Sequence, residues 1–143
     1  MRVCNVVKNS VWYDPRVRKQ LYEYTRRGIE VVCVGVKDIR CDPKEVDKLP
    51  CKISLVDWNA NNSFEKTLAG KILRELNSNQ AISREIINAA PDLIHANDLN
   101  ALIPAYFASK KLNCKLVYDT HEIFLENPWI ARNKFIKFVW GLF

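Results

Sequence analysis

Glycine is scarce in this chain: it occurs 4 times in 143 residues, and none of the four lies in the loop after the first strand-like run. The sequence therefore lacks G-x-G-x-x-G and the P-loop pattern, whose glycines let the backbone approach the phosphates of a nucleotide. It also lacks the G-x-S-x-G nucleophile elbow of a hydrolase. These absences remove the main support for NAD-type binding, for P-loop hydrolysis and for α/β-hydrolase chemistry.

Long apolar runs and closely spaced cysteines are missing as well. No apolar stretch approaches the ~20 residues that a membrane-spanning helix needs, and residues 1–7 enter a strand-like run without the form of a signal peptide. The 5 cysteines form no C-x-x-C pair, so neither a zinc knuckle nor a redox site is indicated. We expect a cytoplasmic protein whose cysteines are structural and inert.

The composition is that of an ordinary globular protein, with 48% hydrophobic and 27% charged residues. A length of 143 residues suits one domain. The formal net charge of +6 favours anionic partners such as phosphates, nucleotides or an acidic membrane surface. The basic residues are scattered and are not interleaved with aromatic ones, so nucleic-acid binding is not expected.

Short apolar runs alternate with helix-like patterns, which is typical of β-α-β units. The run Glu30–Val36 is apolar nearly throughout, as expected of a strand covered on both faces. The pattern predicts an α/β, Rossmann-like open parallel sheet of about five strands with helices on both faces. The expected strands are Arg2–Val7, Glu30–Val36, Cys51–Trp58, Leu93–Ala96 and Lys115–Asp119.

The first helix has a start and a stop signal. Asp14 is its expected N-cap, Pro15 takes the first helical position, and Gly28 ends it. A second helix is expected after Ser63, with the apolar stripe Leu68, Ile72, Leu73 and Leu76. A polar break at Asn77–Gln80 separates it from another helical piece that ends at Ala90. Further helices are expected at about Asn100–Leu112, with Pro104 as a distortion, and from Asn127–Pro128 onward.

In open parallel α/β sheets, ligands bind beyond the carboxyl ends of the strands, where the strand order reverses. With the common order 3-2-1-4-5, the first strand lies beside the fourth, and three strand-end loops converge. These loops are residues 8–14, 95–98 and 119–122. Both histidines of the chain, His95 and His121, fall in them. The carboxylates in the same loops are Asp14, Asp98, Asp119 and Glu122.

Each of these residues also has a purely structural interpretation. Asp14 is expected to act only as a helix cap, and Asp98 is divided between a ligand contact and a cap of the helix that begins near Asn100. A histidine at a strand end is often a hydrogen-bonded structural group. No two of these residues have the i, i+4 spacing of metal ligands on a helix, so no metal site is expected.

Four segments of the chain resemble, in order, the N-terminal half of retaining glycosyltransferases of family 4. Asp14–Val17 and Gly28–Val31 look like that family's D-x-R-V and G-h-E-V opening. Pro91–Asp98 and Lys115–Glu122 are similar to its fourth and fifth strand ends, and the D-x-H-E ending is the most specific of these features. The resemblance implies one half of a GT-B architecture: residues 1–143 form the acceptor-side domain, and the C-terminal donor-binding domain with its E-x7-E motif is absent.

The resemblance implies transfer of a sugar from a UDP- or GDP-sugar to a saccharide or lipid-linked acceptor, with no permanently bound cofactor and no metal. It implies that His121 is the catalytic histidine near the transferred sugar. In the loop after the first strand, Lys8 offers charge, and Trp12 or Tyr13 offers a stacking face. The residues expected to line the acceptor side of the cleft are Lys8, Trp12, Tyr13, His95, Asp98, Asp119 and Glu122.

The loop of residues 8–13 departs from the family because it lacks the glycines that many relatives carry there. Without a donor-binding domain, we expect the isolated chain to be inactive. Two alternatives stay open: a non-catalytic module that pairs with a separate donor-binding subunit or a membrane, and a Rossmann-like small-molecule binder unrelated to sugar transfer. The basic, aromatic stretch Ala131–Phe143 is the candidate for membrane contact, and its other interpretation is a core-facing helix.

Overall fold

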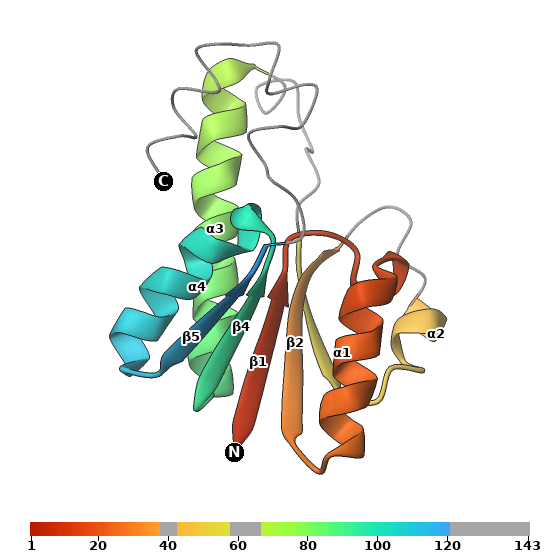
Figure 1. The fold of residues 1–143 in the computed structure, drawn as a ribbon. Coiled ribbons are helices and arrows are strands. Elements are labelled where there is room, and N and C mark those ends of the chain that lie inside the picture. Colours follow the sequence, from red (N-terminus) through yellow and green to blue (C-terminus); the bar gives the residue numbers. More distant parts are fainter. Residues whose placement is uncertain (38–42, 58–66, 121–143) are drawn as a thin grey trace.

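The computed structural model describes residues 1–37, 43–57 and 67–120, which form one parallel sheet flanked by helices (Figure 1). The strands lie in the order β3-β2-β1-β4-β5. Their bounds are β1 Arg2–Val7, β2 Glu30–Lys37, β3 Lys52–Asp57, β4 Leu93–Asn97 and β5 Lys115–Asp119. The predicted fold class, strand order and strands are confirmed, and each strand end differs from its prediction by one residue at most.

The register of the sheet aligns the carboxyl ends of three neighbouring strands. Val7 of β1 pairs with Asn97 of β4, and Asn97 pairs with Asp119 of β5. Because the strands are parallel, the segments that follow these three residues leave the sheet from the same edge. This edge is where the sequence predicts a ligand crevice.

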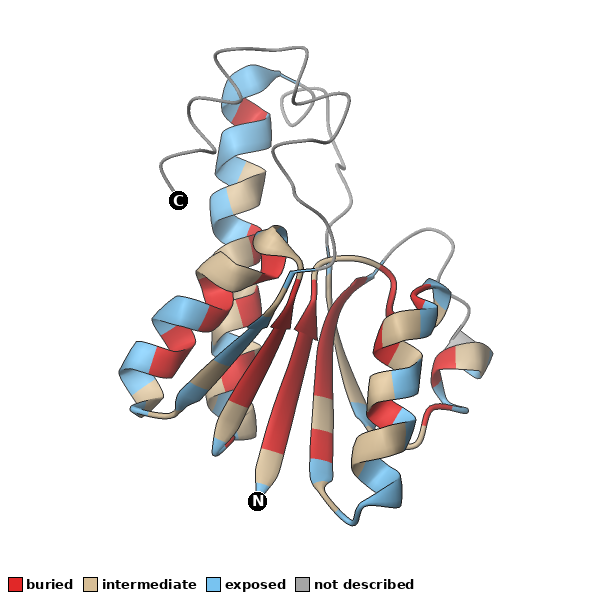
Figure 2. Cartoon of the chain, in the orientation of Figure 1, coloured by how far each residue is buried: buried red, intermediate tan, exposed pale blue. Residues whose placement is uncertain are grey.

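Helices cover both faces of the sheet, as strands that are apolar nearly throughout predict. α1 (Pro15–Arg26) packs Val17 and Leu21 against one face. α3 (Leu68–Ala89) and α4 (Leu99–Leu112) pack against the other, where Ile82 of α3 belongs to the core. Figure 2 shows the central strands β1 and β4 buried along most of their length between these two layers.

α1 begins and ends as its sequence predicts. The Asp14 carboxylate accepts hydrogen bonds from the N–H groups of Arg16 at 3.0 Å and Val17 at 3.3 Å, and Pro15 opens the helix. Gly28 follows the last turn at φ +70°, a left-handed conformation that glycine adopts without a Cβ penalty. The start of α1 is therefore held firmly at the carboxyl edge of the sheet.

Gly35 of β2 lets the loop after β1 lie close to the sheet. A Cβ atom at Gly35 would lie 2.4 Å from Cγ2 of Val11, a buried residue of the short helix η1 (Val11–Tyr13). The N–H of Val36 donates to the carbonyl of Asn9 at 3.3 Å. The absence of a side chain at Gly35 thus fixes the position of the loop that forms one wall of the site.

The predicted break in the third helix is wrong. α3 is a single helix from Leu68 to Ala89, and its cap is Thr67, whose hydroxyl accepts from the N–H of Gly70 at 3.1 Å. Ser63, the predicted cap, lies outside the described residues. Two polar residues of the expected break face the rest of the fold: Asn79 accepts a hydrogen bond from Lys8 of the β1 loop, and Ser78 is buried. Local polarity therefore does not end this helix.

The apolar stripe expected on the first half of α3 is not packed in the core. Its four side chains are 50–76% exposed: Leu68, Ile72, Leu73 and Leu76. The first half of α3 extends beyond the carboxyl ends of the strands (Figures 1 and 2), so the sheet cannot cover it. The second half of α3 packs against the sheet, and its Ile82 and Ile86 are fully buried.

Three smaller points complete the fold. α4 continues through Pro104, whose carbonyl accepts a hydrogen bond from the Ser83 hydroxyl at 3.0 Å. A short helix, α2 (Pro43–Val46), lies in the connection between β2 and β3. In the described part of the chain, no helix combines the length and apolarity needed to cross a membrane. The helix expected from Asn127–Pro128 and the stretch Ala131–Phe143 lie outside the described residues.

Candidate functional site

The site is built around an arginine that links two strand-end loops. The Arg16 guanidinium donates to the Asp14 carboxylate at 2.9 Å and to the Asp98 carboxylate at 3.4 Å. Asp14 precedes α1 and Asp98 precedes α4, so Arg16 joins the loop after β1 to the loop after β4. The hydrogen bond to Asp14 is the main reason that the pKa of Arg16 is raised, so Arg16 keeps its charge.

A hollow of about 250 Å³ lies beside this cluster, at the turn between β1 and α1. Its lining residues are Asn9, Ser10, Tyr13, Asp14, Pro15 and Arg16. Two buried oxygen atoms in this set, Asn9 Oδ1 and Ser10 Oγ, have no hydrogen-bond partner among the described residues. A buried polar atom without a partner is unfavourable, so a hydrogen bond to either oxygen, from a ligand or from an ordered water, would stabilise it.

Asp98 has a backbone conformation that is rare for any residue except glycine. Its φ of 65° and ψ of 156° fall in a region where a side chain is strained by about 1–3 kcal/mol. It occupies the N-cap position of α4, but its carboxylate makes no capping hydrogen bond and contacts Arg16 instead. The Asp98 side chain therefore does not cap α4. Its backbone is strained, and its carboxylate is paired with Arg16.

The strain predicts an unusual stability order. Asp98→Gly is expected to be about 1–2 kcal/mol more stable than Asp98→Ala, because both lack the carboxylate but only glycine relaxes the backbone. Urea unfolding of the two variants measures this difference. Asn113, at φ 51° and ψ 41°, is the control, since its ordinary left-handed conformation predicts a smaller difference between glycine and alanine. Equal stability of Asp98→Gly and Asp98→Ala would show that Asp98 is not strained.

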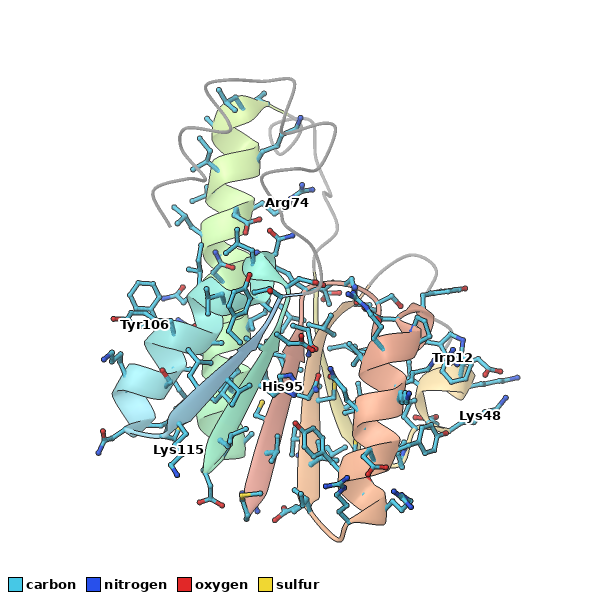
Figure 3. All side chains as sticks on the ribbon, in the orientation of Figure 1. Trp12, Lys48, Arg74, His95, Tyr106 and Lys115 are labelled. Atoms are coloured by element: carbon cyan, nitrogen blue, oxygen red, sulfur yellow. The ribbon has the colours of Figure 1, made fainter. Side chains whose placement is uncertain are left out.

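His95 lies beneath the site rather than in its wall. It is 8% exposed, and its Nδ1 is 2.7 Å from the hydroxyl of Tyr24 on α1. Its Nε2 is 3.8 Å from the Asp119 carboxylate at the end of β5. Figure 3 shows His95 between the sheet and α1. A direct contact between His95 and an acceptor stays a prediction, while its contacts here are with Tyr24 and Asp119.

The three predicted residues of the loop after β1 have different surroundings. Tyr13 is 56% exposed and lines the hollow. Trp12 is half-buried against the core beside α1, its ring lies under Arg18 at 4.8 Å, and Figure 3 shows it away from His95. Lys8 is buried and forms an ion pair with Glu75 of α3. Its charge therefore links the loop to α3 instead of facing the hollow.

His121 and Glu122 lie outside the described residues, so their roles stay predictions. The structure adds site residues that sequence reasoning missed, namely Asn9, Ser10 and Arg16. Arg16 belongs to the segment Asp14–Val17, which resembles the opening of the family. That resemblance was the only feature of the sequence that pointed to Arg16. Asn9 and Ser10 gave no signal, because an amide and a hydroxyl in a loop are ordinary surface residues.

Neither metal-ligand clusters nor reactive thiols add to this site within the described ranges. No three side chains of histidine, cysteine, aspartate or glutamate gather there in a way that could hold a metal ion. The four cysteines in those ranges carry free thiols. Burial raises the pKa of Cys4 to about 12, which keeps its thiol protonated and unreactive.

Comparison with known proteins finds similarity only at the level of structure. No family model matches the chain, and no curated protein does. CalG4, the calicheamicin glycosyltransferase, is similar with a TM-score of 0.64 and 15% identity over 97% of this chain and 39% of its own. A glycosyltransferase from Rickettsia africae ESF-5 is similar with a TM-score of 0.57 and 19% identity over 94% of this chain and 34% of its own.

A third similar structure comes from another class of protein. The C-terminal domain of the PF1911 hydrogenase from Pyrococcus furiosus has a TM-score of 0.60 and 11% identity, over 82% of this chain and 90% of that domain. At these identities the likeness shows the fold alone, a Rossmann-like α/β fold. The chain spans only 34–39% of the length of the two glycosyltransferases.

Proposed function

We propose that this chain is the acceptor-binding half of a retaining, family 4-type glycosyltransferase with GT-B architecture. It holds a saccharide or lipid-linked acceptor, while a second domain, in the same chain or a separate one, holds a UDP- or GDP-sugar. Its fold, shared with parts of two glycosyltransferases, and the order of four sequence segments support this proposal. The observation that carries it is a hollow at the strand-end edge that combines hydrogen-bonding side chains with the exposed ring of Tyr13.

Hydrogen-bonding side chains line the hollow, and the Asp98 carboxylate is linked to them through Arg16. An ionised Asp98 carboxylate can only accept hydrogen bonds, and Asn9 Oδ1 is a further acceptor without a partner among the described residues. A sugar presents several hydroxyl donors on a neutral body, so it matches this set. The exposed ring of Tyr13 adds an apolar surface against which the carbon face of a sugar can pack.

The local charge disfavours a phosphate in the same place. Arg16 lies between two carboxylates, and Lys8 is paired with Glu75. The two charged residues that line the hollow, Asp14 and Arg16, are paired with each other, so the hollow offers a diphosphate no unpaired positive charge, even though the whole chain has a net charge of +6. We accordingly assign the donor diphosphate to the other half of the enzyme. His121 and Glu122 are proposed to act where the two halves meet, and membrane contact through Ala131–Phe143 stays a prediction.

An NMR titration of the ¹⁵N-labelled chain tests the acceptor assignment. Methyl hexosides and disaccharides serve as neutral probes, with UDP and NAD as anionic ones. We expect the neutral sugars to shift the amide signals of Asn9, Ser10 and Tyr13. The variant Asn9→Leu lacks the free acceptor oxygen and should weaken sugar binding about fivefold. The control Lys19→Met changes an exposed charge on α1 and should leave sugar binding unchanged.

The titration can also contradict the proposal. If UDP or NAD shifts the amides around the hollow and no sugar does, the chain is a Rossmann-like nucleotide binder instead. If no probe shifts them, the hollow is not the acceptor site. Equal sugar affinity in Asn9→Leu and the unmodified chain would remove Asn9 from the site.

A further inference from the structure

Three polar side chains of α1 contact the strand-end groups of the sheet. Arg16, Gln20 and Tyr24 are spaced four residues apart, so they lie along one side of the helix. Arg16 contacts Asp98 after β4, Gln20 contacts Asp119 at the end of β5, and Tyr24 contacts His95 of β4. We call these three residues the α1 polar stripe. Together they connect a single helix to the two strand ends that border the crevice.

Gln20 forms the middle contact of the stripe. Its side-chain N–H donates to Asp119 at 3.1 Å, and its side-chain oxygen accepts from Asn5 of β1 at 2.8 Å. Asn5 accepts in turn from Asn97 at 2.8 Å, and both asparagines are fully buried. Since this amide chain crosses β1 and β4 below the crevice, a shift of Gln20 would disturb both Asp119 and the strand ends.

The groups on either side of His95 favour a proton on its Nε2. An ionised Asp119 can only accept, so the nitrogen that faces it, Nε2, is the favourable place for the proton. Neutral His95 then has Nδ1 as an acceptor, and the Tyr24 hydroxyl, at 2.7 Å, donates to it. Burial, followed by the nearby charge of Asp119, raises the pKa of Tyr24, so the phenol keeps the proton it donates.

We propose that Gln20 and Tyr24 are positioning residues of the acceptor site: Gln20 holds the Asp119 carboxylate by a direct hydrogen bond, and Tyr24 orients the His95 ring, whose Nε2 lies 3.8 Å from that carboxylate. This inference rests on the proposed function, because a positioning residue needs a bound ligand to act upon. Its structural part, the orientation of His95 and Asp119 by α1, can be measured without any ligand. Neither residue touches the hollow, since neither is among its lining residues.

The protonation of His95 can be followed by NMR because the chain has few histidine signals to assign. His95 and His121 are the only 2 histidines, so ring ¹⁵N signals are assigned with one His121→Gln variant. Above the ordinary pKa of histidine, we expect His95 to be protonated on Nε2. Tyr24→Phe keeps the edge-on ring contact with His95, at 6.1 Å between centroids, but removes the hydroxyl donor. It should shift the tautomer ratio of His95 about fivefold toward Nδ1–H.

Tyr22→Phe is the matched control, because it removes the same hydroxyl from a side chain of α1 that is 52% exposed. Gln20→Leu should move the amide signals of Asp119 and Thr120, and both Gln20→Leu and Tyr24→Phe should raise the Kd for neutral sugars about threefold or more. An Nδ1–H tautomer in the unmodified chain, or equal tautomer ratios in Tyr24→Phe and Tyr22→Phe, overturns the positioning role of Tyr24.

The ligand measurements separate this inference from the proposed function. If the unmodified chain binds no sugar while Tyr24→Phe still shifts His95, the proposed function fails and the orientation by α1 stands. If the unmodified chain binds sugars and both variants bind them equally well, the function stands and the positioning role is wrong.

Discussion

Replacing Asp14 with alanine is expected to lower the free energy of unfolding by about 3 kcal/mol, as measured by urea denaturation. The Asp14 side chain is only 5% exposed. It caps α1 through two backbone N–H groups and also accepts from Asn9 at 3.2 Å and from the Arg16 guanidinium. The variant removes a helix cap and leaves the donors of Asn9 and Arg16 without their acceptor, so the losses combine.

The Asp14 carboxylate also makes the free energy of unfolding depend on pH. Burial of Asp14 acts to raise its pKa, but hydrogen bonds from Arg16, from Asn9 and from the Val17 N–H outweigh it and lower the pKa from 3.8 to about 2. Because the folded pKa lies below the unfolded one, the stabilisation is fully present above pH 4 and is lost as the pH falls toward 2. The difference corresponds to about 2 kcal/mol.

Asp14→Asn is the matched control for this pH dependence. Asparagine keeps a capping oxygen but does not ionise, so its unfolding free energy should be lower than that of the unmodified chain at pH 6 and should approach it near pH 2. A constant difference between the two proteins across this range would show that Asp14 is not the carboxylate responsible.

His121→Ala is expected to lower kcat for sugar transfer by about 100-fold or more, once the chain is assayed together with a donor-binding domain. On the proposed function, His121 lies next to the sugar that is transferred, where a hydrogen-bond donor stabilises charge that develops only in the transition state. Such a residue contributes to kcat rather than to folding. We therefore expect the free energy of unfolding to change by less than about 0.5 kcal/mol.

His121→Gln distinguishes hydrogen bonding from proton transfer. If His121 acts as a donor, glutamine should restore part of the lost kcat, whereas a role in proton transfer predicts no recovery. Unchanged turnover in His121→Ala would remove this residue from the catalytic site. A loss of turnover that is matched by a loss of stability would identify His121 as a structural residue.

Much of the fold could be predicted because its signals are local. A buried parallel strand is a short apolar run, and the pair Asp14–Pro15 marks a helix start whatever surrounds it. The continuity of α3 could not be predicted in this way. Asn77–Gln80 is locally polar, but Asn79 accepts a hydrogen bond from the distant Lys8, and Ser78 is buried in the fold. Tertiary contacts decide such a segment, and a helical period does not reveal them.

Strand ends indicate the edge of the sheet where the hollow lies, but they do not indicate its chemistry. The pairing of Arg16 with Asp98 joins residues 82 positions apart. The net charge of +6 does not indicate that the two charged residues lining the hollow, Asp14 and Arg16, are paired with each other. In the sequence, Tyr24 continues the apolar spacing of Val17 and Leu21, although its hydroxyl binds His95. A tyrosine side chain is both apolar and polar, and only the structure shows which part is used.

The central place of β1 has a consequence for how the chain folds during synthesis. β1 is made before its two neighbours in the sheet, and Val3 pairs on one side with Val31 and on the other with Leu93. At the usual pace of translation, the roughly 90 residues between Val3 and Leu93 take about 5–20 s to emerge. During this time one edge of β1 has no partner in its own sheet. Slowing translation before residue 93 should therefore increase aggregation of the nascent chain, because an open strand edge pairs readily with other chains.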